Sequence, residues 1–235
     1  MRVRLVPGFT HTARSWEGVE RVLPPDWDVQ TIEVPDGLDF VATADTIGHR
    51  GGPAIWVGYS MGARLCVRLA LDNPTLVYAL ALVSGSPGIR NAGEREARIA
   101  EDEQRAQDLE RDGIDIFLER WLEQRLFETL PREAAMLDER RRGNTVRRLA
   151  HQLRSLGQGV QEPLWDRLSE LTMPVLLVAG SYDRAYTSIA WRMADAIGPS
   201  ARVVIMERAG HAVALEQPKA LAHELAAWAD GTQAA

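Results

Sequence analysis

Short apolar runs recur along the chain and alternate with segments whose apolar residues are spaced as in helices. The runs are nearly continuous and rich in β-branched residues, as expected of parallel strands that are buried on both faces. They cover Val3–Val6, Val29–Val34, Ala54–Val57, Ala79–Val83, Pro174–Ala179 and Arg202–Met206. Strands that alternate with helices predict right-handed crossovers in a doubly wound sheet. We therefore expect an α/β fold with a truncated, mainly parallel sheet of about six strands and helices on both faces.

The alternation is interrupted once, between about Asn91 and Gly159. This stretch is rich in Glu, Arg, Leu and Ala, which favour helix. Its apolar positions, such as Phe117, Leu118 and Trp121, fall at helical spacing. We expect residues 1–90 and 160–235 to form one core domain, and residues 91–159 to form an all-helical cap inserted between two strands.

Length and charge narrow the class of protein. The chain has 235 residues, of which 46% are hydrophobic, and this is enough for one domain with a sizeable core. Its net charge of −6 argues against a nucleic-acid partner. The N-terminus lacks the apolar core of a signal peptide, and the longest apolar run, Val77–Val83, is too short to span a bilayer. We expect a cytoplasmic protein with no membrane partner.

The strongest local motif is Gly58-Tyr59-Ser60-Met61-Gly62, which follows an apolar strand and precedes a helix. This is the pattern of a nucleophile elbow, in which a serine sits on a strained turn with its hydroxyl exposed at the edge of the sheet. A serine in an ordinary glycine-rich turn is the simpler alternative, and the flanking strand and helix make it the weaker one. Ser60 is therefore the candidate nucleophile or base.

A serine hydroxyl needs a base and an acid to orient that base, in the chain order Ser, acid, His. His211 lies just after the last predicted strand, where a catalytic base is expected. Asp183 is the carboxylate placed in a post-strand turn between Ser60 and His211, although it could equally cap the next helix. We expect Ser60, Asp183 and His211 to form a triad.

The triad also needs hydrogen-bond donors for developing negative charge. The backbone N–H of Met61, at the start of a helix, is one candidate. The backbone N–H of Phe9 is the other, because it follows the first strand and Gly8 permits a close approach. These two groups would form an oxyanion hole.

Beyond these generic motifs, the chain resembles the MenH family, the 2-succinyl-6-hydroxy-2,4-cyclohexadiene-1-carboxylate synthases of the α/β-hydrolase superfamily. The resemblance covers most of the chain from Pro7 onward. The specific motifs are the tyrosine before Ser60, the arginine four residues after it, and the segment Ser84-Gly85-Ser86-Pro87-Gly88-Ile89 that leads into the predicted cap. Further similar segments are Phe117–Trp121, Leu164–Leu168, Met173–Val175 and Ala209–His211.

The resemblance implies a menaquinone-pathway lyase that eliminates pyruvate from 2-succinyl-5-enolpyruvyl-6-hydroxy-3-cyclohexene-1-carboxylate without a metal or organic cofactor. In such an enzyme the serine acts as a base rather than forming an acyl-enzyme. The substrate is a small molecule with three carboxylates. The resemblance assigns substrate binding to Tyr59, Arg64, Arg98, Trp121 and one arginine of Arg140-Arg141-Arg142, for which we choose Arg141.

Arg64 also has a physical argument of its own. It lies one helical turn past Ser60, and a buried arginine there would be costly without an anion. The alternatives are a pairing with an internal acid or a side chain that extends to solvent. Of the 27 basic residues, 26 are arginine, which binds carboxylates bidentately, although codon bias would give the same composition.

The sequence departs from the family in three places. It has Pro7-Gly8 where many relatives have His-Gly, it has Pro35-Asp36-Gly37 in a loop predicted to border the pocket, and the strands usual before the first glycine turn are missing. These differences leave room for a different substrate. One alternative is a serine esterase or acyl hydrolase acting on a small carboxylate-bearing ester. Another is a non-catalytic binding protein on a decayed scaffold, and the intact Ser60, Asp183 and His211 argue against it.

Overall fold

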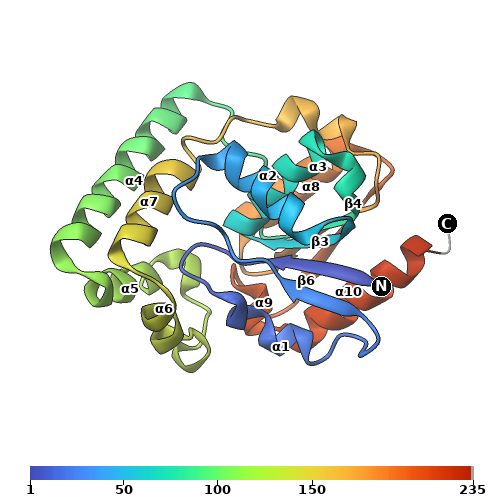
Figure 1. The fold of residues 1–235 in the computed structure, drawn as a ribbon, viewed down its shortest axis with the longest axis horizontal. Helices are drawn as coiled ribbons and strands as arrows, with labels where there is room; N and C mark the ends of the chain where they lie inside the picture. Colours follow the sequence, from blue (N-terminus) through green and yellow to red (C-terminus); the bar gives the residue numbers. More distant parts are fainter. Residues whose placement is uncertain (234–235) are drawn as a thin grey trace.

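Six parallel strands form a single sheet in the order β2-β1-β3-β4-β5-β6 (Figure 1). The computed structural model describes residues 1–233. The strands are β1 (Arg2–Val6), β2 (Asp28–Thr31), β3 (Ala54–Tyr59), β4 (Val77–Val83), β5 (Val175–Gly180) and β6 (Ala201–Met206). The predicted fold class, with about six mainly parallel strands, is confirmed.

One strand is shorter than its apolar run. The run Val29–Val34 predicted a strand to Val34, but β2 ends at Thr31. That prediction was wrong at its C-terminal end because Ile32 and Val34 are apolar for a different reason: both are buried in the core beside the sheet. Ile32 still donates its backbone N–H to the carbonyl of Leu5, and Pro35 follows soon after. The apolar run therefore extends beyond the end of β2, because its last residues are buried without being part of the strand.

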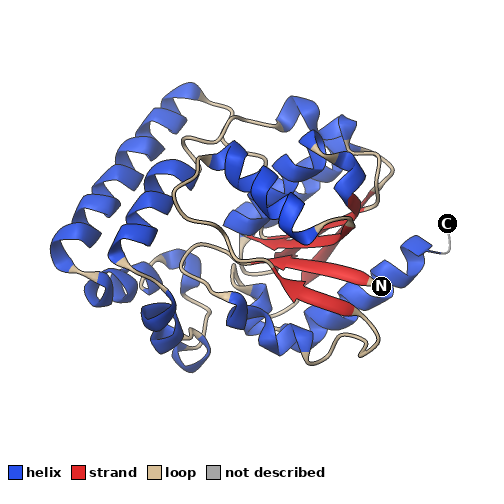
Figure 2. Ribbon diagram, viewed as in Figure 1, coloured by secondary structure: helices blue, strands red, loops and turns tan. Residues whose placement is uncertain are grey.

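Helices cover both faces of the sheet, and each face has its own apolar core (Figure 2). On one face lie α2 (Phe40–Gly51), α3 (Met61–Asp72), the 3-10 helix η5 (Trp165–Glu170) and α8 (Arg184–Ile197). On the other lie η1 (Ala13–Trp16), α1 (Glu17–Glu20), α9 (Val213–Glu216) and α10 (Pro218–Gln233). A short 3-10 helix, η2 (Pro74–Leu76), leads into β4. No helix within residues 1–233 is long and apolar enough to cross a membrane.

Between β4 and β5 the chain forms a group of helices that lies beside the carboxyl ends of the strands (Figures 1 and 2). We call residues 92–156 the insert. Its elements are α4 (Ala92–Asp112), α5 (Ile114–Leu122), η3 (Arg125–Phe127), η4 (Arg132–Ala134), α6 (Leu137–Gly143) and α7 (Val146–Leu156). Side chains of Asn91 and Thr145 cap α4 and α7 by accepting backbone N–H groups.

The insert has a small core of its own, in which α4 packs along α7 and α5 (Figure 1). Buried apolar residues from these helices form it: Ala106, Leu109, Phe117, Leu118, Leu149, Ala150 and Leu153. Phe9, from the loop after β1, packs against the same cluster. The insert is thus a packed unit that contacts the sheet domain at the loop where Phe9 lies.

Candidate active site

The turn between β3 and α3 places Ser60 in a conformation that few residues adopt. Its backbone has φ 51° and ψ −109°, outside the helical and extended regions. The turn is possible because Gly62 lies against β1, where a Cβ atom would overlap the carbonyl oxygen of Val6. The strand, the strained serine and the helix together form the nucleophile elbow that the motif predicted.

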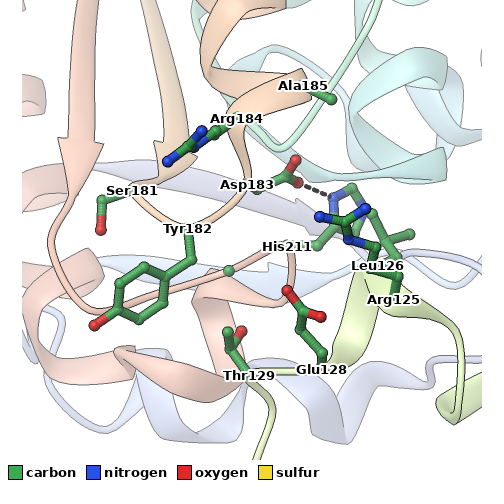
Figure 3. Close-up of a pocket in the computed structure, with 11 residues that line it drawn as sticks. Arg125, Leu126, Glu128, Thr129, Ser181, Tyr182, Asp183, Arg184, Ala185 and His211 are labelled. Atoms are coloured by element: carbon green, nitrogen blue, oxygen red, sulfur yellow. Dashed lines mark hydrogen bonds and ion pairs between the residues drawn. The ribbon is translucent and has the colours of Figure 1, made fainter.

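Ser60, His211 and Asp183 are brought into hydrogen-bond contact. The Ser60 hydroxyl lies 3.1 Å from Nε2 of His211. Nδ1 of His211 lies 2.8 Å from Oδ2 of Asp183, a hydrogen bond that Figure 3 shows as a dashed line. Because a carboxylate can only accept, Nδ1 carries the proton and Nε2 is the acceptor for the serine hydroxyl. His211 is 1% exposed, so these two hydrogen bonds are shielded from solvent.

Asp183 serves two structures at once. Its Oδ1 accepts the backbone N–H of Tyr186 at 3.2 Å and so caps α8, while Oδ2 orients His211. Capping and orientation were alternatives from the sequence, and the structure combines them. The carboxylate is held in place by the helix that it caps, which fixes the direction of the histidine ring.

The loop that carries His211 is organised by Glu216, a residue that was not identified from the sequence. The carboxylate of Glu216 accepts the backbone N–H of Gly210 at 2.9 Å and that of Ala212 at 3.0 Å, one on each side of His211. It also accepts the hydroxyl of Thr129 from the insert at 2.8 Å. The only sequence signal for this role was an acidic residue five positions after the histidine.

Phe9 and Met61, the two predicted oxyanion donors, lie around the same small cavity as Ser60. Met61 is the first residue of α3, so its N–H has no carbonyl one turn earlier in the helix to bond to. Gly8 precedes Phe9, and a Cβ atom there would lie 2.8 Å from the ring of Tyr59. The absence of a side chain at Gly8 therefore lets the loop approach β3 closely.

The cavity has a volume of about 110 Å³ and lies between the triad and the insert. Ser60, Met61 and His211 line it from the sheet domain, and α4, α5 and α7 contribute residues from the insert. Its lining includes polar and charged side chains from both parts: Arg64, Arg98, Asp102, Arg105, Gln124, Gln152, Gln158 and Tyr186. A cavity so rich in arginine and amide groups suits an anionic ligand better than an apolar one.

Arg64 lines this cavity and is 5% exposed. Its guanidinium donates to Oε1 of Gln161 at 2.9 Å and to the carbonyl of Leu156 at 2.7 Å. Among residues 1–233 no carboxylate forms an ion pair with it. Burial lowers the pKa of Arg64 to about 10, so the group stays cationic at neutral pH. Neither structural alternative, an internal acid partner or extension to solvent, applies.

Arg98 also reaches the cavity, but it is already paired. Its Nε lies 2.9 Å from Oδ1 of Asp102, a buried carboxylate that Arg105 also contacts at 3.1 Å. The same guanidinium donates to Gln158 at 2.9 Å. Asp102 thus holds two arginines at the wall of the cavity and partly neutralises them. Its position one helical turn after Arg98 was the only sequence signal for it.

Trp121 lies in the cavity wall and contacts the predicted oxyanion loop. Its ring packs edge-on against Phe9, with centroids 4.8 Å apart. The guanidinium of Arg105 covers the other part of the ring, 5.7 Å from its centroid. The indole N–H is buried and has no partner within the described part of the chain.

Two predicted binding residues are placed elsewhere. Tyr59 is buried in the sheet core, with its ring 5.6 Å from that of His211, and it does not line the cavity. Arg141 points to the outer surface, where it pairs with Asp115 at 2.8 Å. Neither side chain lies at the cavity: Tyr59 points into the core on the face of the sheet that α9 and α10 cover, and the rotation of α6 turns Arg140 inward instead of Arg141.

Tyr186 is a cavity residue that was not predicted from the sequence. Its ring packs edge-on against His211 with centroids 4.5 Å apart, and its hydroxyl accepts a hydrogen bond from Gln158 at 2.8 Å. Burial raises the pKa of Tyr186, so the hydroxyl remains protonated. The signal was its place three residues after Asp183, in the first turn of the helix that the acid caps.

A larger hollow of about 850 Å³ lies on the other side of His211 (Figure 3). It is lined by the turn Ser181–Ala185 and by the segment Arg125–Thr129 of the insert, and Ser60 is not part of its wall. Leu126 and His211 line both spaces and separate them. The reactive serine therefore faces the smaller cavity.

Comparisons with known proteins agree with this geometry. A model of the alpha/beta hydrolase family matches residues 5–224. A Bacillus subtilis (strain 168) protein, named provisionally as a 2-succinyl-6-hydroxy-2,4-cyclohexadiene-1-carboxylate synthase, is 38% identical over 167 residues, which are 69% of this chain and 61% of that protein. The chain thus matches less than two thirds of that relative's length.

Two further similarities extend over more of each chain. A protein of Serratia proteamaculans (strain 568) with the same synthase name is 29% identical over 217 residues, or 86% of this chain and 82% of that one. The solved structure of MenH from S. aureus has a TM-score of 0.92 at 25% identity and covers 99% of this chain and 94% of that one. The resemblance predicted from the motifs is confirmed.

Proposed function

Because this chain belongs to the alpha/beta hydrolase family, and similar relatives carry the synthase name, we propose that it is a carbon–oxygen lyase of the MenH type. Its substrate would be 2-succinyl-5-enolpyruvyl-6-hydroxy-3-cyclohexene-1-carboxylate, and its products the corresponding 2,4-cyclohexadiene and pyruvate. The observation that carries the proposal is Arg64: a buried guanidinium, without a carboxylate partner in the described chain, in the cavity that holds Ser60.

The proposed chemistry begins at the triad. His211 accepts the hydroxyl proton of Ser60, and the serine oxygen takes the ring proton next to the succinyl ketone. The electron pair left on that carbon delocalises onto the ketone oxygen, and the N–H groups of Phe9 and Met61 stabilise the resulting enolate. Asp183 stabilises the protonated histidine.

Elimination then completes the reaction. The enolate collapses, the ring double bond shifts, and the carbon–oxygen bond to the enolpyruvyl group breaks, so that two conjugated double bonds remain in the ring. The leaving enolate takes the proton held by His211 and becomes pyruvate, which returns the triad to its starting state. The net change is the transfer of one proton and the cleavage of one carbon–oxygen bond, with no electrons gained or lost, so the scheme requires no redox cofactor.

The arginines have a separate role in binding. Arg64 offers its charge directly to one substrate carboxylate, while Arg98 and Arg105, which also line the cavity, are held by Asp102. Charge-assisted, bidentate hydrogen bonds suit this task.

Ligand sites commonly measure about 300–1,000 Å³, so a cavity of about 110 Å³ must enlarge to admit this substrate. We infer that the insert moves relative to the sheet domain during each cycle.

A direct comparison of two activities tests the proposal. Purified protein is incubated with the enolpyruvyl substrate while pyruvate is measured through lactate dehydrogenase, and parallel samples receive p-nitrophenyl esters of short acids. We expect pyruvate release that Ser60→Ala abolishes, with slow ester turnover. Rapid ester hydrolysis without pyruvate release would replace the lyase by the esterase alternative. Loss of neither activity in Ser60→Ala would remove the triad from both reactions.

A further inference from the structure

A buried arginine of the insert, Arg140 on α6, contacts the loop after β1. Arg140 is 1% exposed, and within residues 1–233 no carboxylate pairs with it. Its Nε donates to the carbonyl of Ala135 at 2.7 Å, while its two terminal nitrogens contact the hydroxyl of Thr10 and Nε2 of His11. The guanidinium thus joins the insert to two consecutive residues of the sheet domain.

Thr10 has a backbone conformation that needs such support. Its φ is +66°, in the left-handed region that a β-branched residue rarely adopts. Strained backbone persists only where its surroundings hold it. Besides Arg140, the side chain of Asn144 in the insert donates to the carbonyl of Thr10 at 2.9 Å. Thr10 directly follows Phe9, so a change in the backbone of Thr10 would displace Phe9 from its place in the cavity wall.

The contact between α6 and this loop continues past Thr10. The hydroxyl of Thr12 donates to Glu139 at 3.1 Å, and a Cβ atom on Gly143 would overlap the side chain of Thr12. His11 stacks on Tyr59 with ring centroids 5.1 Å apart, which connects the loop to the strand that ends at the elbow. Residues along α6, from Glu139 to Gly143, therefore contact the loop after β1.

We propose that Arg140 is a positioning residue that holds the Phe9 N–H in the direction required for the oxyanion hole. This inference rests on the proposed function in one respect, which is the role of the Phe9 N–H as an oxyanion donor. A buried guanidinium bound only to neutral acceptors is an energetically unfavourable way to fasten a loop. An arginine in this place has two effects that a neutral side chain would not combine. It fixes the position of the loop after β1, and it makes that position depend on contact between the insert and the sheet domain.

The first test measures the oxyanion hole without the natural substrate. A fluorophosphonate forms a bond from phosphorus to the Ser60 oxygen as fluoride leaves, and its phosphoryl oxygen occupies the position of the oxyanion. We expect Arg140→Gln to slow this reaction by about 10- to 100-fold, since complete removal of one oxyanion donor costs about 10²- to 10³-fold. Arg142→Gln is the matched control, because Arg142 lies on the same helix with an exposed side chain, and it should react at the parent rate.

The second test asks whether Thr10 mediates the effect. Glycine adopts a positive φ without strain, so Thr10→Gly should make the loop less dependent on Arg140. We expect Arg140→Gln to reduce the rate by less than about threefold in the Thr10→Gly background. Near-UV circular dichroism of each variant establishes that it is folded, and Arg140→Lys, which keeps the charge but not the fork, is measured in place of any Arg140→Gln protein that fails to fold.

The kinetic constants for pyruvate release separate positioning from substrate binding. A positioning role lowers kcat and the phosphonylation rate together and leaves KM within about twofold. A raised KM with both rates unchanged, or equal effects of Arg140→Gln in the parent and in the Thr10→Gly background, would overturn the inference, as would a parent protein that does not react with the fluorophosphonate. A parent protein that reacts with the fluorophosphonate but releases no pyruvate would sink the proposed function and leave this inference testable.

Discussion

Replacing Arg64 by methionine should remove much more activity than stability. Methionine keeps most of the length and the apolar stem but has no charge and no donors. In the ligand-free protein burial lowers the pKa of Arg64 from 12.5 to about 10, which corresponds to a free-energy cost of about 3 kcal/mol for keeping that charge buried. Methionine removes this cost.

Methionine also removes the hydrogen bonds of Arg64 to Gln161 and to the carbonyl of Leu156. Hydrogen bonds to a charged group contribute about 1.5–3 kcal/mol each, so the loss of the two costs about 3–6 kcal/mol, of which the removed burial cost offsets about 3 kcal/mol. We expect the free energy of unfolding to fall by less than about 3 kcal/mol. The substrate complex has no such compensation. Loss of a buried charge pair costs about 2–5 kcal/mol, or a fall in kcat/KM of roughly 30- to several thousand-fold.

Urea denaturation gives the stability and the coupled pyruvate assay gives kcat/KM for each variant. Arg68→Met is the control, because Arg68 lies one turn further along α3 and pairs with Asp72 and Glu162 outside the cavity. It should keep kcat/KM within about twofold. The reasoning is refuted if Arg64→Met loses about 3 kcal/mol or more of stability, as breaking a buried ion pair does, while the folded protein keeps its kcat/KM.

Three further outcomes follow from the geometry of the site. Asp183→Asn should lower kcat by about 10⁴-fold in the pyruvate assay, since the amide no longer selects the tautomer of His211; a loss below about tenfold would contradict the triad. Gly62→Ala should destabilise the protein by about 1–3 kcal/mol in urea denaturation, because its Cβ would overlap the carbonyl of Val6; unchanged stability would show that β1 moves freely. Burial, and then Arg140, lower the pKa of His11 well below its usual value, so the unfolded chain binds a proton near pH 6.5 that the folded protein does not. Stability should be complete above that pH and fall below it by up to about 1.4 kcal/mol per pH unit, and His11→Phe should show a shallower dependence; equal slopes would exclude His11 as the source.

Arg64 and Arg140 are both buried, but they have different surroundings. Burial lowers the pKa of each to about 10, and neither has a carboxylate partner in the described chain. Arg64 faces the cavity beside Ser60, whereas Arg140 is occupied by Thr10 and His11. A ligand in the cavity can bind Arg64, but it cannot reach Arg140. The two proposed roles, binding for Arg64 and positioning for Arg140, thus rest on the direction of each side chain and not on its burial.

Features that depend on local chemistry or on strand order could be predicted from the amino-acid sequence. The turn at Ser60 needs glycine on both sides, so its motif can be recognised in five residues. Asp183 and His211 could be located because each follows a strand, and parallel strands bring their carboxyl ends to one edge of the sheet. The six-stranded sheet could likewise be predicted from the apolar runs, and the helical character of the insert from its composition and from the apolar spacing around Phe117–Trp121.

Which side chains of those elements face the cavity was decided by tertiary packing. Successive residues of a helix point about 100° apart, and α6 reads Leu-Asp-Glu-Arg-Arg-Arg-Gly, with no apolar stripe to fix its rotation. Docking against Thr10 selected Arg140 over Arg141. Tyr59 belongs to a strand buried on both faces, where apolar character cannot distinguish the two sides. The rotation of α6 depends on contacts between residues more than a hundred positions apart, which no local pattern of the chain encodes.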